Sequence, residues 1–244
     1  MSNNDFIFGI RAIIEAIRSG KTIDKLLIKK GLQGELYLEL AELIKEYHLN
    51  VQSVPEEKLN RVTRKNHQGA IAFVSPVPFF DMEEIITRTY EKGETPFFLY
   101  LDQITDVRNF GAIVRSAECA GVHAIIIPEK GSAQINADAI KTSAGAIYNV
   151  PICKVRNAHS TLLNMQQNGI KLFAATEKAD TIYTNEDYST PCTLIMGSED
   201  EGISTEIIRI ADRLIKIPLK GKIESLNVSV ATGILLFEVV KQRN

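Results

Sequence analysis

The sequence predicts an α/β protein whose larger part is a parallel sheet covered by helices on both faces. From about residue 97 onward, short apolar segments alternate with segments of helical period. The apolar segments, such as 97–101 and 193–196, are hydrophobic at nearly every position, which is typical of strands buried on both sides. The chain has 244 residues, 45% of them hydrophobic, enough for one large or two modest domains. Ligands of such sheets bind at the carboxyl ends of the strands.

Residues 1–75 are predicted to form a small α/β domain of their own. Ile10, Ile13, Ile14 and Ile17 recur at the spacing of an amphipathic helix. The same reasoning predicts a second helix over 36–47, a third that begins at Pro55, and strands at 26–28, 51–54 and 70–74.

A break in the pattern predicts a linker at 76–94. Pro76 and Pro78 interrupt regular structure, and a charged, helix-like stretch at 81–92 follows them before Gly93. The second domain is therefore predicted to span 95–244. Its strands are predicted at 97–101, 124–127, 150–155, 171–175, 193–196 and 214–217, and its helices at 111–120, 136–145, 161–167, 205–210 and 227–241.

The composition limits the classes of function. The formal net charge of −2 indicates no global field for nucleic acid, so RNA binding would need a local basic patch. Residues 1–75 carry two such clusters: Lys21, Lys25, Lys29 and Lys30 around one strand, and Arg61, Arg64, Lys65 and His67 in a loop. Each cluster alone is most simply a solvated face. Two in one small domain predict contacts with an RNA backbone.

The cysteines predict neither a disulfide framework nor a metal site. Cys119, Cys153 and Cys192 are odd in number and far apart, without Cys-x-x-Cys spacing. No apolar run reaches the length of a membrane span, and residues 1–5 do not resemble the start of a signal peptide. We therefore expect a cytoplasmic protein with no metal and no membrane contact.

Three loops at predicted strand ends carry the polar residues that chemistry needs. The first, 102–116, contains Asn109-Phe110-Gly111 as a predicted turn into a helix, with Arg115 one turn further on. The second, 194–203, places the acidic residues around Glu199 between two glycines. The third, 217–231, carries Ser225 and Asn227 where a helix is predicted to begin. Helix capping and a surface position for the arginine are the simpler interpretations of these residues.

The acidic second loop disfavours a polyphosphate ligand. It has glycines but no positive charge, and the chain has neither a Gly-x-Gly-x-x-Gly nor a Gly-Lys-Ser/Thr sequence in these loops. A dinucleotide-dependent oxidoreductase is therefore disfavoured. A neutral or cationic ligand fits better.

Taken together and in order, the three loops resemble the signature motifs of the SpoU branch of the SPOUT methyltransferases. The resemblance lies in residues 109–115, in 196–202, and in 217–221 with 225–231. The first 75 residues, with 8–10 and 67–69, are similar to the L30e-like substrate-binding domain of the 23S rRNA guanosine-2'-O-methyltransferase group. The resemblance implies a parallel-sheet SPOUT domain with a C-terminal deep trefoil knot, and 2'-O-ribose methylation of RNA, foremost of a guanosine in 23S rRNA.

The resemblance also implies a cofactor, S-adenosyl-L-methionine, and roles for individual residues. The catalytic group it implies is Arg115, Asn227, Ser225, Glu199 and Asn109, and the cofactor-binding group is Gly197, Ile217, Leu226, Met196 and Pro218. The arginine acts either as a base or as a charged group that stabilises the developing alkoxide. The second is favoured because a guanidinium holds its proton.

A homodimer with its site near the subunit interface is a further implication. The final helix, with Ile234, Leu235, Phe237 and Val239, is either the interface or plain core. Val107, Phe110 and Asp200 depart from the residues common in the family, and Asp200, where glycine is frequent, is expected to alter loop 197–202.

Two alternatives remain at this stage. One is a tRNA ribose methyltransferase of the same branch. The other is a non-catalytic RNA-binding or ribosome-assembly factor, against which the retained polar motif residues argue.

Overall fold

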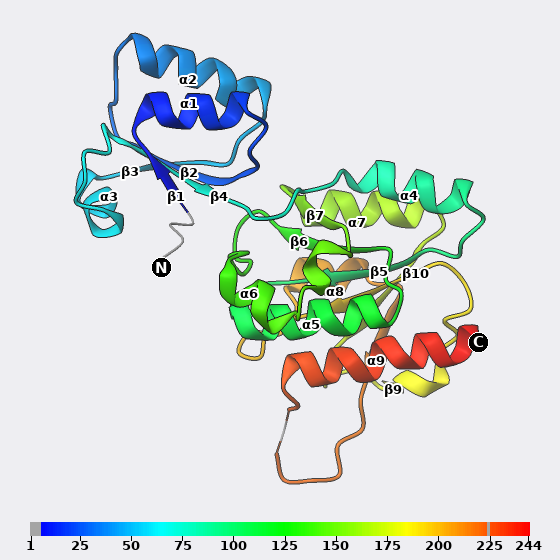
Figure 1. Ribbon diagram of the computed structural model, residues 1–244. Coiled ribbons are helices and arrows are strands. Elements are labelled where there is room, and N and C mark those ends of the chain that lie inside the picture. Colours follow the sequence, from blue (N-terminus) through cyan, green and yellow to red (C-terminus); the bar gives the residue numbers. More distant parts are fainter. Residues whose placement is uncertain (1–5, 224) are drawn as a thin grey trace. The chain divides into compact units, whose positions relative to one another are not determined.

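The computed structural model describes residues 6–223 and 225–244, in two compact units that divide between Pro78 and Phe79 (Figure 1). Residues 1–5, to which the expectation about a signal peptide refers, lie outside the described residues, as does Glu224 within the third loop. Among the residues described, no helix is both long and apolar enough to cross a bilayer.

The first unit is a four-stranded sheet in the order β1-β4-β2-β3 with helices on both faces. The strands are β1 (Phe6–Phe8), β2 (Ile23–Lys29), β3 (Val51–Val54) and β4 (Ala70–Val74), and the helices are α1 (Ile10–Arg18), α2 (Glu35–Glu46) and α3 (Glu56–Val62). Alternate residues of β2 explain the two faces, because Leu26 packs with α1 and α2 whereas Leu27 packs with Leu59 of α3.

The second unit is a seven-stranded sheet in the order β7-β6-β5-β10-β8-β11-β9, and every pair of neighbours is parallel. The strands are β5 (Phe97–Leu101), β6 (Ala124–Pro128), β7 (Ile152–Val155), β8 (Lys171–Ala175), β9 (Thr181–Ile182), β10 (Cys192–Met196) and β11 (Arg213–Lys216). The helices are α4 (Met82–Glu91), α5 (Val107–Cys119), α6 (Ala137–Thr142), α7 (Ala158–Gln167), α8 (Thr205–Ile210) and α9 (Val228–Arg243), with short 3-10 turns at Ala146–Tyr148 and Tyr183–Asn185.

Helices cover both faces of this sheet, as the continuous apolar strands predict. Side chains of α4, α7 and α8 pack in one core with Phe98, Tyr100 and Ile195. On the other face α5 and α9 lie side by side (Figure 1). The predicted parallel α/β class is therefore confirmed.

The stretch predicted as a linker contains α4, whose Met82, Ile85 and Ile86 enter the core of the second unit. Five predicted elements have the bounds observed: β3, β4, β5, β8 and α8. The two-residue β9 is too short to carry a periodic signal and is missing from the prediction.

The predicted turn at Asn109-Phe110-Gly111 is wrong, because these residues lie inside α5. The helix begins four residues earlier than predicted, since Asp106 caps it by accepting the backbone N–H of Asn109 at 2.7 Å. Gly111 serves packing instead. A Cβ there would lie 2.7 Å from the Cβ of Thr142, so glycine allows α6 to approach α5.

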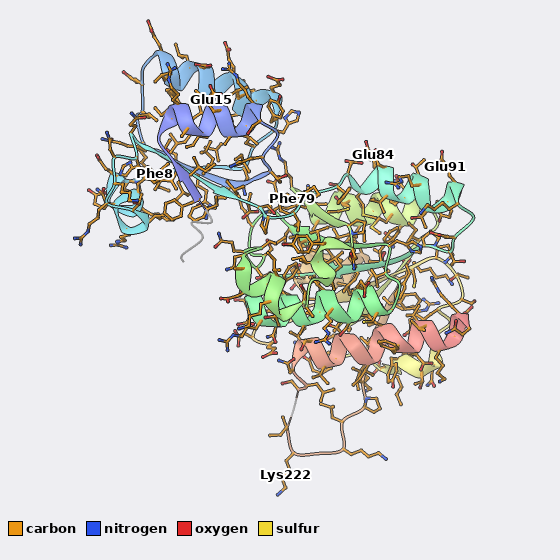
Figure 2. The ribbon with its side chains drawn as sticks, viewed as in Figure 1. Phe8, Glu15, Phe79, Glu84, Glu91 and Lys222 are labelled. Atoms are coloured by element: carbon orange, nitrogen blue, oxygen red, sulfur yellow. The ribbon has the colours of Figure 1, made fainter. Side chains whose placement is uncertain are left out.

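Strand order places the loops of distant segments at one edge of the second unit. β10 lies between β5 and β8, and β11 lies on the far side of β8. Because parallel strands point the same way, the residues that follow Leu101, Ala175, Met196 and Lys216 all emerge at the same edge. The segment after β11 then projects away from the sheet, and Figure 2 labels Lys222 near its tip.

Candidate active site

A cavity of about 400 Å³ lies at this edge, at the carboxyl ends of β8, β10 and β11. Of the residues predicted to bind the cofactor, Met196, Gly197, Ile217 and Leu226 line it. Pro218 is not among its lining residues, although its neighbours on both sides are. The other residues around it are Ala175, Thr176, Glu177, Lys178, Ser198, Glu199, Asp200, Glu201, Gly202, Ile215, Lys216, Leu219, Ser225, Val228 and Ala231.

The loop after β10 forms one wall of the cavity and is closed by backbone contacts. A Cβ at Gly197 would lie 2.1 Å from the carbonyl carbon of Gly202, so only glycine fits there. Gly202 has a φ of +71° and donates its N–H to Ser198 O at 3.0 Å. Asp200 is not among the described residues with a positive φ, so its backbone needs no glycine.

A buried carboxylate holds the far end of the same loop. Asp102, 4% exposed, accepts the N–H of Ser204 at 2.7 Å and the hydroxyl of Tyr100 at 3.1 Å. Burial, together with this carboxylate, raises the pKa of Tyr100 above its ordinary value, which keeps the hydroxyl a donor. Asp102 was not among the predicted site residues.

Three polar residues, one from each predicted loop, meet in one network. Glu199 Oε1 accepts Nδ2 of Asn227 at 2.8 Å, the N–H of Val228 at 3.0 Å and Nδ2 of Asn109 at 3.4 Å. The amide of Asn227 also donates to Oδ1 of Asn109 at 3.0 Å. The network joins the first turn of α5, the loop after β10 and the start of α9.

Asn227 is both a helix cap and a member of this network. Its Oδ1 accepts the backbone N–H of Ser229 at 3.0 Å and that of Val230 at 3.4 Å, which caps α9. Its Nδ2 is thereby turned toward Glu199. Ser225 lines the cavity and has no hydrogen-bond partner within the described part of the chain.

Arg115 lies outside the cavity. It is exposed on α5 and does not line the space between the loops. Within 6–223 and 225–244 it makes no ion pair or hydrogen bond. α9, which lies beside α5, is apolar on several sides and exposes Val230 (51%) and Phe237 (49%).

The predicted site omitted the loop after β8. Thr176, Glu177 and Lys178 line the cavity, and Lys216 at the end of β11 does so as well. The sequence could have indicated this loop, because the strand at 171–175 is predicted and the loops that follow parallel strands lie at the edge of the sheet where ligands bind. These residues bring both signs of charge to one wall.

The basic residues of the first unit divide into two groups. Lys29 and Lys65 line a cavity of that unit of about 420 Å³, whereas Lys30 and Arg64 do not. Lys29 pairs with Glu56, and Nζ of Lys65 lies 5.8 Å from the ring centre of Phe8, which Figure 2 labels. In neither described range do three or more His, Cys, Asp or Glu side chains form a cluster suited to a metal ion.

Comparison with known proteins identifies close likenesses over the whole chain. Residues 96–237 match the model of the SpoU rRNA methylase family, and residues 6–80 match a model described as RNA 2'-O ribose methyltransferase substrate binding. A putative TrmH family tRNA/rRNA methyltransferase of Bacillus subtilis is 34% identical over 241 residues, which cover 99% of this chain and 97% of the relative.

Two solved structures are also similar. The AdoMet-bound rRNA methyltransferase from Sinorhizobium meliloti has 25% identity and a TM-score of 0.61, and the match covers 97% of this chain and 86% of that one. The TrmH/SpoU tRNA-modifying enzyme of A. aeolicus has 35% identity and a TM-score of 0.56, over 66% of this chain and 83% of its own.

Proposed function

Since the chain belongs to the SpoU rRNA methylase family of RNA methyltransferases, we propose that it transfers a methyl group from S-adenosyl-L-methionine to a ribose 2'-hydroxyl of RNA. The observation that carries this proposal is the network of Asn109, Glu199 and Asn227 beside a cavity at the ends of parallel strands. It joins all three polar loops at one place.

The residues around the cavity suit this cofactor. Met196, Leu226 and Ala231 offer apolar surface to an adenosine, and the tight loop from Gly197 offers backbone groups. Glu177 and Lys216 provide opposite charges for the ammonium and carboxylate of an amino-acid moiety. When bound, the cofactor supplies an electrophilic methyl group on a cationic sulfur, and the acidic residues of loop 197–202 suit its positive charge.

The chain's own residues would then position the ribose and manage its proton. A hydroxyl must lose its proton as it attacks, and the developing alkoxide needs a positive partner. Arg115 remains charged and supplies this partner. Asn227 and Ser225 hold the hydroxyl. Glu199, which accepts three donors, fixes the amides of Asn109 and Asn227.

The position of Arg115 supports a site shared between two copies of the chain. The arginine does not reach the cavity of its own chain, and it lies on the helix beside the apolar α9. A second copy seated on the α5–α9 face would cover Val230 and Phe237 and bring Arg115 toward the partner's cavity. We therefore propose a homodimer as the active form.

The proposed RNA is 23S rRNA, modified at a guanosine. Support comes from the first unit, because the similar rRNA methyltransferase matches both units whereas the similar tRNA-modifying enzyme matches only about two thirds of the chain. A tRNA substrate is the second candidate, because the curated relatives carry both RNA classes in their names. Mapping of 2'-O-methylation in rRNA and tRNA, with and without the protein, decides between them.

The test of the catalytic proposal is Arg115→Ala. Loss of the charge that stabilises the alkoxide lowers the methyl-transfer rate on the order of 10²-fold or more, while cofactor affinity measured by calorimetry is unchanged. Arg209→Ala on α8, which is also exposed, is the matched control with a normal rate. A normal rate for Arg115→Ala would refute the assigned role. Absence of cofactor binding in the wild type would favour an assembly factor.

The basic clusters of the first unit are proposed to contact the RNA backbone. Replacement of Lys29, Lys30, Arg64 and Lys65 by glutamine together is expected to weaken RNA binding and to flatten its dependence on salt, since fewer counterions are released. An unchanged slope of log affinity against log salt would place the RNA elsewhere.

A further inference from the structure

The cavity of the first unit is built from three segments of that unit. It lies where the end of β2, one side of α3 and the stretch before β4 meet. Its volume is about 420 Å³, which leaves room for one nucleotide. The residues around it are Lys29, Leu32, Glu56, Asn60, Lys65, Asn66, His67, Gln68 and Gly69.

A buried histidine, His67, fixes the orientation of the side-chain amide of Asn60 in this cavity. His67 is 6% exposed, and its Nδ1 accepts the backbone N–H of Gly69 at 3.0 Å, so this nitrogen carries no proton. Nε2 must then be the donor to Oδ1 of Asn60, 3.1 Å away. The carbonyl of the Asn60 amide is thereby occupied. Its NH₂ group is left with two donor hydrogens and no hydrogen-bond acceptor among the residues described.

A fixed acceptor stands one helical turn away from this donor. Glu56 and Asn60 are four residues apart on α3, so their side chains lie on the same face. Lys29 pairs with Oε2 of Glu56 and lowers the pKa of that carboxyl below its ordinary value, which keeps it ionised. Oε1 makes no ion pair or hydrogen bond with any described residue, and it remains available as an acceptor.

The backbone under the cavity is held in an unusual conformation. Gln68 has a φ of +51°, uncommon for a residue with a side chain, and Gly69 follows with +81°. The side chain of Gln68 stabilises this turn, because its Oε1 accepts the N–H of Ile10 at 3.2 Å. The turn places Gly69 N–H on His67 and so orients Asn60 before any ligand arrives.

A carboxylate beside an amide donor matches guanine in particular, because guanine alone among the four bases presents two adjacent donors on its pairing edge. Guanine presents two adjacent donors, N1–H and the 2-amino group, followed by the O6 acceptor. Adenine, cytosine and uracil each present a single donor beside an acceptor, so each of them can give the carboxylate one hydrogen bond where guanine gives two. Lys29 and Lys65 at the rim supply charge for the flanking phosphates.

We propose that this cavity binds one unpaired guanine of the RNA, with Glu56 accepting from N1–H and the 2-amino group and Asn60 donating to O6. The proposal rests on the proposed RNA substrate and adds a sequence requirement to it. The guanine held here is a recognition nucleotide bound by the first unit.

The test uses the full-length protein and single-stranded uridine heptamers that carry guanine, hypoxanthine or adenine at the centre. Binding is measured by fluorescence anisotropy. The wild type is expected to bind the guanine heptamer about tenfold more tightly than the adenine heptamer, with the hypoxanthine heptamer, which lacks the 2-amino group, in between. Glu56→Gln, which replaces one acceptor oxygen by a donor, is expected to abolish the preference.

Glu57→Gln is the matched control, because Glu57 is the exposed neighbour on α3, carries the same charge and does not line the cavity. It is expected to keep the preference for guanine. Equal affinity of the wild type for all heptamers would overturn the proposal. So would an equal loss of preference in Glu56→Gln and Glu57→Gln.

Methyl transfer to rRNA by the same preparations separates this inference from the proposed function. If the wild type methylates rRNA but binds all heptamers equally, only the proposed guanine site is refuted. The opposite outcome is a protein that methylates no RNA but prefers guanine, with the preference lost in Glu56→Gln. It would refute the proposed activity and support the guanine site.

Discussion

The two units carry cavities of nearly equal volume, about 400 and 420 Å³, that are built in opposite ways. In the second unit, backbone closes on backbone within the single loop that holds Gly197 and Gly202, and the cavity lies at the ends of strands that are far apart in the sequence. In the first unit, side chains from the end of β2, from α3 and from the stretch before β4 line the space. The backbone wall of the second unit fixes the shape of its cavity. The side-chain wall of the first unit offers hydrogen-bonding groups that a single substitution can change.

The acidic residues at the two cavities, Glu199 and Glu56, also differ in the contacts that they make. One oxygen of Glu199 accepts three donors from its own chain. Glu56 is held by one lysine and keeps an oxygen available. A carboxylate that accepts three donors from different segments of its own chain organises those segments, whereas one held by a single lysine is better placed to bind a ligand. We therefore expect substitutions in the second unit to act on assembly of the site and those in the first to act on recognition.

The largest effect is expected for Gly197→Ala. The new methyl group would lie 2.1 Å from a backbone carbon and 2.3 Å from the N of Ile203, so the loop must open. Such a clash costs about 2–3 kcal/mol, and cofactor affinity in calorimetry falls on the order of 10²-fold. Gly221→Ala is the control, because its Cβ would meet nothing closer than 4.0 Å. RNA binding by the first unit should be unchanged, and its loss would contradict the independence of the two cavities.

The next effect concerns the end of α9. Arg243 donates to four carbonyl oxygens, those of Tyr188, Thr95, Pro96 and Thr190, and so fixes the helix whose first residue joins the active-site network. Arg243→Ala should lower the free energy of unfolding of the second unit by about 2–3 kcal/mol in urea. Arg209→Ala should change it by less than about 0.5 kcal/mol. An equal loss in both variants would mean that the four bonds do not stabilise the fold.

A smaller effect tests whether the network acts as one unit. Glu199→Gln and Asn227→Ala each remove part of the same hydrogen-bonded group. The rate loss of the double variant should fall short of the sum of the single losses by about 1–2 kcal/mol. Methyl-transfer rates of the four proteins measure this coupling. Strictly additive losses would show that the two residues act separately.

The smallest effect is expected in the first unit, at Gly69→Ala. Its Cβ would lie 2.9 Å from Cδ1 of Leu32, the far end of a flexible side chain in the cavity wall, so the wall yields. Gly31→Ala is the control, since both glycines have a positive φ and no atom lies near the Gly31 site. Both variants should lose about 1 kcal/mol of stability. Only Gly69→Ala should weaken RNA binding, by a few-fold in anisotropy, and equal weakening in both would contradict this.

Several elements could be predicted closely because their signal is local. The strands at 70–74 and 97–101 are largely buried apolar runs bounded by turn residues, and they have the bounds observed. The start of α5 could not be predicted from apolar spacing, because the cap at Asp106 decides it. Asn109, Glu199 and Asn227 form one hydrogen-bonded network, as expected for loops that follow parallel strands. Arg115, in contrast, does not line the cavity of its own chain.

The sequence by itself determined the α/β class, the parallel character of the large sheet and the family, because each of these depends on short-range periodicity or on short motifs. Only the tertiary structure decided that β10 lies between β5 and β8, that Thr176 to Lys178 share the cavity with Gly197, and that His67 forms a hydrogen bond with Asn60. Strand order and hydrogen-bond direction depend on contacts between residues far apart in the chain, and no local pattern encodes them.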